Sequence, residues 1–265
     1  HKWGVYHSSD DKYKVMTTDE IIKHGVRRGE VSNFGIAVTK PLELEKKELL
    51  IDPYLLGMWL GDGFSYSANI TVGFDDIDEF YKQIENRGYN VVFNNKYRTA
   101  HSVRVDNLSH KKLRELNVLK NKHIPSIYLR ASIEQRTELL KGLMDSDGGA
   151  QGVGCEFYTS SEVLLKGFLE LVRSLGFKAR YKSKQSKLYG INKKIAYRVW
   201  FLTQDKNKVF SYEKKLNKII ECKTNRACRN SIREINPVDS VPSRCIQVNN
   251  KDHLYLCGES FIVTH

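Results

Sequence analysis

The sequence has few cysteines and no long apolar run, and both absences narrow what the protein can be. Five cysteines occur in 265 residues, and no two of them form a Cys-x-x-Cys pair. An odd, unpaired set indicates neither a disulfide framework nor a zinc knuckle. No stretch approaches the roughly 20 apolar residues of a membrane span, and no charged-then-apolar leader is present. We therefore expect a cytoplasmic protein with reduced cysteines and no membrane partner.

Acidic residues are the minority charge, and the motifs of several enzyme classes are missing. The sequence shows no phosphate-binding P-loop, no nucleophile elbow and no Ser/His/Asp arrangement that a sequence can place. Lys and Arg number 43 against 31 Asp and Glu, which gives a net charge of +12. This balance favours a polyanionic partner such as nucleic acid. The hydrophobic content of 40% is sufficient for one large or two small domains.

The middle of the chain repeats one pattern of elements. A helix that begins at Asp52-Pro53 is almost entirely apolar and ends at Asp62-Gly63, and a second run over 136–146 ends at Asp147-Gly148. Strand-like residues, an amphipathic helix and further strands follow each Asp-Gly pair. This internal repeat predicts an α+β fold built as a pseudo-symmetric duplication.

The repeat sets the expected domain limits. We expect one domain over residues 49–235, with repeats at about 49–120 and 134–220. Residues 1–48, which predict a hairpin and then a short helix, and residues 236–265 form a separate β-rich part. The two end pieces must therefore meet in space.

Small residues allow the two Asp-Gly helices to pack closely. Gly57 and Gly61 lie four apart, as do Gly142 and Ser146, so each helix carries a stripe that permits close backbone approach. Packing along these stripes would bring the C-terminal ends together.

Close packing would leave Asp62 and Asp147 side by side. Like charges at the unfavourable end of two helix dipoles are costly without a cation. Carboxylates suit Mg²⁺, which can activate water and stabilise the leaving oxygen in phosphodiester hydrolysis. The alternative is that each Asp-Gly is an ordinary turn, but two matching copies favour a site. Leu60 occupies the place of Asp145 in the first copy, so Asp145 is predicted to be structural.

These residues resemble a known family. Residues 55–63 (LLGMWLGDG) and 140–148 (LKGLMDSDG) are similar to the two signature motifs of LAGLIDADG homing endonucleases. Residues 122–125 (KHIP) resemble a block typical of the endonucleases found inside inteins. The resemblance implies a duplicated αββαββα fold whose four-stranded sheets saddle DNA. It also implies a monomer that makes double-strand breaks at a long site.

The resemblance carries site residues over by position. Asp62 and Asp147 match the metal-binding acids, with two or more Mg²⁺ ions shared between them, and we assign the preceding Gly61 and Ser146 to the same metal site. Lys122 matches an active-site lysine. Its counterpart is expected within 209–216, where the prediction is Lys215 and the near alternatives are Lys214 and Lys218. A lysine there would stabilise charge on the scissile phosphate, although any single lysine can equally be a solvated surface charge.

Basic residues alternate along one predicted strand, which places them on one sheet face. Such a face can lie in the major groove of double-stranded DNA and read bases with Arg and Lys. An edge strand protected by lysines is the alternative. The predicted DNA-binding residues are Lys178, Arg180, Lys182 and Lys184 in the second repeat, Lys96, Arg98 and Arg104 in the first, and Lys193 and Lys194 at a hairpin tip.

The chain ends resemble parts of an intein. His1 is similar to the end of a Thr-x-x-His block, and His253 and His265 match C-terminal splicing blocks. A junction nucleophile and a terminal Asn are absent from this chain, so we expect no splicing from it. Two alternatives to the endonuclease remain: an intein whose main activity is splicing, and a DNA-binding protein or RNA maturase of the same fold without cleavage.

Overall fold

The computed structural model describes two compact units. It covers residues 2–9, 12–188, 191–224, 228–242, 244, 246–249 and 253–264, and the side chains of 186–188 and 191–194 lie outside this description. One unit comprises 1–40 with 224–265, and the other comprises 41–223. These limits differ from the expected domain limits at 48 and 235. The backbone N–H of Leu42 donates to Ser174 O (2.9 Å), which ties the segment after 40 to the second unit.

The first unit contains an antiparallel sheet of order β13-β5-β1-β2, formed from both ends of the chain. A capping box between Thr17 and Glu20 starts its helix, as the sequence predicts. Val5, Met16, Ile21 and Phe34 form its small core. Its elements are β1 (Lys2–His7), β2 (Tyr13–Thr17), α1 (Thr18–His24), β3 (Arg27–Arg28), β4 (Val31–Ser32), β5 (Phe34–Ala37), β13 (Arg229–Ser231), β14 (Tyr255–Cys257) and β15 (Ile262–Thr264).

The second unit contains the two repeats, joined by α4 (His110–Glu115) and α5 (Ser126–Leu129). The first repeat consists of α2 (Pro53–Asp62), β6 (Ile70–Gly73), η1 (Phe74–Asp76), α3 (Ile77–Glu85), β7 (Val91–Lys96) and β8 (Ala100–Val105). The second consists of α6 (Ile133–Ser146), β9 (Gly148–Gln151), β10 (Gly154–Thr159), α7 (Glu162–Ser174), β11 (Arg180–Leu188), β12 (Ile191–Leu202), η2 (Lys206–Lys208) and α8 (Glu213–Leu216). This order confirms the duplicated α+β fold.

The two sheets differ by one strand. The second repeat has a four-stranded sheet of order β11-β12-β10-β9, as expected, whereas the first has three strands in the order β6-β8-β7. The missing strand is reduced to a single bridge between Gly63 and Ile70. A tight turn in which the Ser67 N–H donates to Phe64 O (3.1 Å) leaves too few residues there to form a strand.

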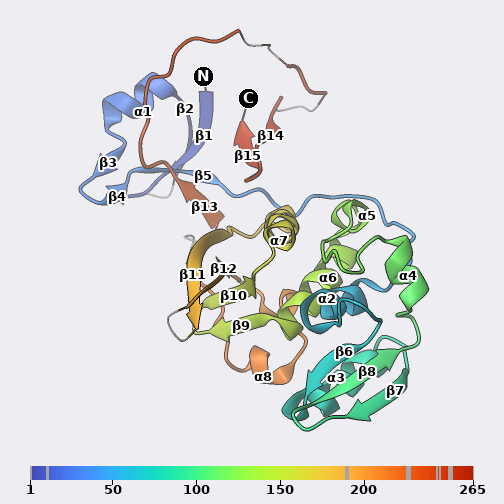
Figure 1. Ribbon diagram of the computed structural model, residues 1–265. Helices are drawn as coiled ribbons and strands as arrows, with labels where there is room; N and C mark the ends of the chain where they lie inside the picture. Colours follow the sequence, from blue (N-terminus) through green and yellow to red (C-terminus); the bar gives the residue numbers. More distant parts are fainter. Residues whose placement is uncertain are drawn as a thin grey trace. The chain divides into compact units, whose positions relative to one another are not determined.

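Helices α2 and α6 lie side by side in the middle of the second unit (Figure 1). A Cβ atom added to Gly142 would lie 2.1 Å from Tyr54 O, and one added to Gly57 would lie 2.5 Å from Leu139 O. The predicted small-residue contact is therefore confirmed. Helix α6 begins at Ile133, three residues before the predicted run, because Ser132 and Gln135 form a capping box.

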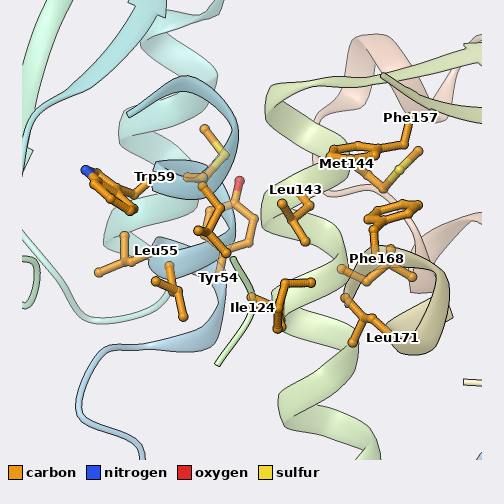
Figure 2. Close-up of a cluster of buried hydrophobic side chains, with 14 of the residues drawn as sticks. Tyr54, Leu55, Trp59, Ile124, Leu143, Met144, Phe157, Phe168 and Leu171 are labelled. Carbon is orange, nitrogen blue, oxygen red and sulfur yellow. The ribbon is translucent and has the colours of Figure 1, made fainter. Parts of the chain in front are cut away.

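One hydrophobic core runs through both repeats. Figure 2 shows part of it, where side chains of α2 and α6 lie together with Phe157 and Phe168, whose rings stack with centroids 3.9 Å apart. The cysteines within the described residues are free thiols. Among the helices of the described residues, none has the length and apolar character needed to cross a membrane.

Candidate active site

The paired helices bring one carboxylate from each repeat to a common place. Asp62 is the last residue of α2, and Asp147 is the C-cap of α6. The two helix ends touch, since a Cβ added to Gly61 would lie 2.0 Å from Ser146 Oγ and 3.4 Å from Asp147 Oδ2. Backbone geometry thus joins the two acids that the repeat predicted.

Both acids are in an environment that disfavours their charge. Burial, followed by the nearby charge of Asp147, raises the pKa of Asp62 to about 6. Burial also raises the pKa of Asp147, against the opposing effects of Lys122 and then Lys215. The C-terminal ends of two helix dipoles add to this cost. Positive charge near these two carboxylates would therefore favour their ionised forms.

Two lysines lie at the same helix ends. Lys122 Nζ donates to Gly61 O (2.9 Å). Lys215 Nζ donates to Met144 O (2.7 Å), Asp145 O (2.7 Å) and Gly148 O (2.8 Å) and lies 3.3 Å from Ser146 O. Burial lowers the pKa of each lysine to about 8.

Geometry distinguishes Lys215 from its two near alternatives. Lys214 forms an ion pair with Asp76, and Lys218 is exposed. Of the three lysines, Lys215 is therefore the one that contacts the end of α6.

The donor set suits a hard cation. It consists of carboxylate oxygens, with backbone carbonyl oxygens at the helix ends, which are the ligand types of Mg²⁺. The described residues contain no cluster of three or more His, Cys, Asp or Glu side chains that could hold a metal. A cation at Asp62 and Asp147 would therefore need water or phosphate oxygens to complete its coordination. Gly61 O already accepts from Lys122, and Ser146 Oγ donates to Gly142 O (2.9 Å), so these two stay predictions as metal ligands.

Asp145 has a supporting position, as predicted. Its side chain is 4% exposed. It accepts hydrogen bonds from Tyr54 Oη (3.0 Å) and from the backbone N–H groups of Ser211 (3.1 Å) and Tyr212 (3.2 Å). Asp145 thus joins three segments and uses its oxygens for them.

The second sheet has a basic outer face. Residues paired across an antiparallel ladder point to the same side, and Tyr181 pairs with the fully buried Val199. Arg180, Lys182 and Lys184 therefore point away from the core, and all three are exposed. Lys178 precedes β11 and is not part of this face, because the strand begins two residues later than predicted.

Further residues of this face were missed from the sequence. Arg198 pairs with Lys182 across the ladder, and Trp200 pairs with Arg180. The Arg198 guanidinium contacts Glu156, which also accepts from Tyr158 Oη. Alternation of core and outward residues over 197–201 was the signal that could have identified Arg198 and Trp200.

The first sheet does not present its predicted residues on one face. Arg104 pairs with Phe93 on the outer side, but Lys96 pairs with His101 on the side of the buried Val103. Lys96 Nζ lies 5.2 Å from the Phe74 ring centroid. The register of β7 and β8 therefore places Lys96 and Arg104 on opposite sides of the first sheet.

The remaining predicted residues are Arg98, the two lysines of the predicted hairpin tip and the three histidines assigned to splicing blocks. Arg98 is exposed in the turn between β7 and β8, and His253 is exposed in the first unit. Lys193 and Lys194 belong to β12, but their side chains lie outside the described part. His1 and His265 also lie outside the described residues.

Part of the chain is similar to a known protein family. Residues 123–225 match the homing endonuclease family model. The replicative DNA helicase DnaB of Mycobacterium intracellulare is 34% identical over 237 residues, which cover 88% of this chain and 38% of that protein. The chain thus spans well under half the length of this relative.

Solved structures of the homing endonuclease I-DmoI are also similar to the chain. The structure of its mesophilic variants shows 18% identity and a TM-score of 0.42, and the match covers 62% of this chain and 97% of that one. A complex of I-DmoI with DNA and Mn shows 18% identity and a TM-score of 0.41, with coverages of 62% and 98%.

Proposed function

We propose that this chain is a LAGLIDADG homing endonuclease that hydrolyses both strands of double-stranded DNA at one long site with the help of Mg²⁺. The observation that carries the proposal is the joined end of α2 and α6. There, one half-buried carboxylate from each repeat lies near two half-buried lysines, Lys122 from the connection between the repeats and Lys215 from the second repeat. The family match over residues 123–225 supports the same conclusion.

The residues of the site would have different roles in cleavage. Asp62 and Asp147 would hold the divalent cations between the helix ends. Bound Mg²⁺ would supply Lewis acidity toward the scissile phosphate and its attacking water. Lys122 donates one hydrogen bond to Gly61 O, which leaves two of its N–H groups available to a phosphate oxygen.

Lys215 would act differently from Lys122. Its three N–H groups are engaged by carbonyl oxygens of the α6 end. It would therefore contribute a fixed positive charge rather than a direct hydrogen bond. The charge of Lys215 lowers the pKa of Asp62 more than the charge of Lys122 does. Lys215 would therefore favour the ionised form of the Asp62 carboxylate.

The outer sheet faces would bind the DNA. Arg180, Lys182, Lys184 and Arg198 point outward from the second sheet, and Arg104 points outward from the first. Arginine side chains can recognise guanine, and lysines can hold phosphates. Because one copy contains both repeats, a monomer would suffice to contact both half-sites.

Selection from a randomised duplex library with Mg²⁺ tests the proposal. The full chain should cleave a small set of related long sequences. Binding of duplex DNA without cleavage would instead favour a DNA-binding protein of this fold. Binding of structured RNA alone would favour a maturase. Both results would contradict the endonuclease.

A second role concerns the first unit, which we infer to derive from a protein-splicing domain. Both chain ends share its sheet, through pairing of β13 with β5, so an endonuclease inserted between them would leave their fold intact. The 34% identity to a DnaB protein supports an origin within such a host. Expression of the uninterrupted natural reading frame tests this inference. Ligated flanking segments would support it, and a stable unprocessed precursor would contradict it.

A further inference from the structure

The two active-site lysines are held in chemically different ways. We propose that helix α3 of the first repeat and its flanking residues Asp76 and Arg87 clamp the Lys215 segment of the second repeat, so that weakening this clamp slows cleavage of one DNA strand and spares the other. The inference rests on the proposed endonuclease function. The Lys215 segment is defined as residues 211–216.

Polar side chains of the first repeat contact the Lys215 segment at successive positions. Arg87 donates to Ser211 Oγ (3.1 Å), and Gln83 Nε2 donates to Ser211 O (3.3 Å). Lys82 Nζ lies 2.6 Å from a carboxylate oxygen of Glu213. We call these contacts, together with the ion pair between Asp76 and Lys214, the α3 clamp.

Arg87 is itself fixed from three directions. Its guanidinium carbon lies 3.6 Å from the Tyr54 ring centroid, and its side chain pairs with Glu138 (2.6 Å) of α6. It also donates to Gln83 O (2.9 Å). Side chains of the Arg87–Glu138 pair are 15% and 32% exposed, so solvent screens this pair less than a surface pair. The α3 clamp is therefore anchored to both motif helices.

The segment that carries Lys122, residues 120–125, contacts the second repeat through an apolar side chain. Ile124 lies against α7, where a Cβ added to Gly167 would be 3.3 Å from Ile124 Cβ. Within its own repeat, the Lys120 N–H donates to Ser65 O (2.8 Å). Apolar packing of this kind is insensitive to charge changes in α3.

Because Lys122 and Lys215 are held by different contacts, cleavage of one DNA strand can be separated from cleavage of the other. A duplex has two scissile phosphates, and the site supplies two lysines, Lys122 and Lys215. Loss of the α3 clamp would displace Lys215 from the end of α6 while Lys122 keeps its contact with Gly61 O. The chain would then nick one strand at the normal rate and cut the second slowly.

Strand-resolved cleavage of a supercoiled plasmid tests the proposal, with the plasmid carrying a sequence recovered from the randomised library. Lys215→Ala first identifies the strand that depends most on Lys215. The clamp variant is Ser211→Ala with Glu213→Gln, which removes the hydrogen bond from Arg87 and the ion pair with Lys82 and leaves Arg87 in place. Asp76 is left unchanged because its charge also acts on Asp62. Glu45→Gln, which loses an exposed ion pair with Lys47 elsewhere, is the matched control.

We expect the clamp variant to slow the Lys215-dependent strand by about fivefold or more, since each lost hydrogen bond contributes modestly. Nicked circles should accumulate, while Glu45→Gln behaves as the unmodified chain. Glu213→Lys should give the same defect, and adding Lys82→Glu should restore most of the lost rate because the ion pair is rebuilt with reversed charges.

Other outcomes overturn the proposal. Equal slowing of both strands, an unchanged rate, or no rescue by the reversed pair would each show that α3 does not position Lys215. If the unmodified chain cuts no member of the library, the proposed endonuclease function fails, and the clamp fails with it.

Discussion

The contact between the two motif helices gives a sharp prediction for Gly142→Ala. An added Cβ would lie 2.1 Å from Tyr54 O and 2.9 Å from Met58 N, both of which are backbone atoms of α2. Real Cβ contacts are almost never shorter than 3.0 Å, so the two backbones would have to separate by about 0.9 Å. Such overpacking costs about 1–3 kcal/mol or more, against about 1 kcal/mol gained from the better helix propensity of alanine.

We expect a net loss of about 2 kcal/mol of unfolding free energy, which corresponds to a decrease in Tm of about 4–8 °C for a unit of this size. Thermal unfolding followed by circular dichroism measures it. Gly149→Ala is the matched control, because its added Cβ would meet nothing within 4 Å. A Gly142→Ala variant with the same Tm as the control would refute the close packing of α2 on α6.

Three further predictions concern DNA. The cleavage rate should fall below about pH 6, because Asp62 gains a proton and loses affinity for the cation. It should also fall above about pH 8, because Lys122 and Lys215 lose their protons. A cleavage rate that is constant across this pH range would exclude a role for these groups. Arg180→Ala should relax base preference in a selection assay, whereas Lys184→Ala should weaken all sequences alike. Affinity measured by gel shift should decrease linearly with the logarithm of salt concentration, since bound phosphates release counterions, and a salt-independent affinity would exclude the basic face.

Much of the fold could be predicted because local patterns and tertiary packing agree. The apolar helix ending at Asp62 and the matching run ending at Asp147 repeat one pattern, and their small residues indicate the contact that the structure contains. The absence of a fourth strand from the first sheet could not be predicted. Its loss depends on one tight turn before Ile70, which changes pairing without changing the residue pattern.

The basic outer face of the sheet was predicted only in part, for reasons of register. Alternation identified Arg180, Lys182 and Lys184 as one outward row. Around Lys96 no such alternation is present, and a bulge between Val91 and Phe93 sets which residues of β7 face outward. A bulge of one residue inverts the face of all that follow, and no residue type in this segment signals it.

The central claim is that Asp62 and Asp147 jointly hold the catalytic cations, and Asp→Asn substitutions test it most directly. Asparagine keeps the size and much of the hydrogen-bonding capacity but removes the charge that the cation requires. Supercoiled-plasmid cleavage with Mg²⁺, paired with a gel-shift titration, should show loss of cutting in each single variant with binding retained or tightened. Undiminished cutting by either variant would remove that aspartate from the site, and undiminished cutting by the double variant would contradict the endonuclease mechanism as a whole.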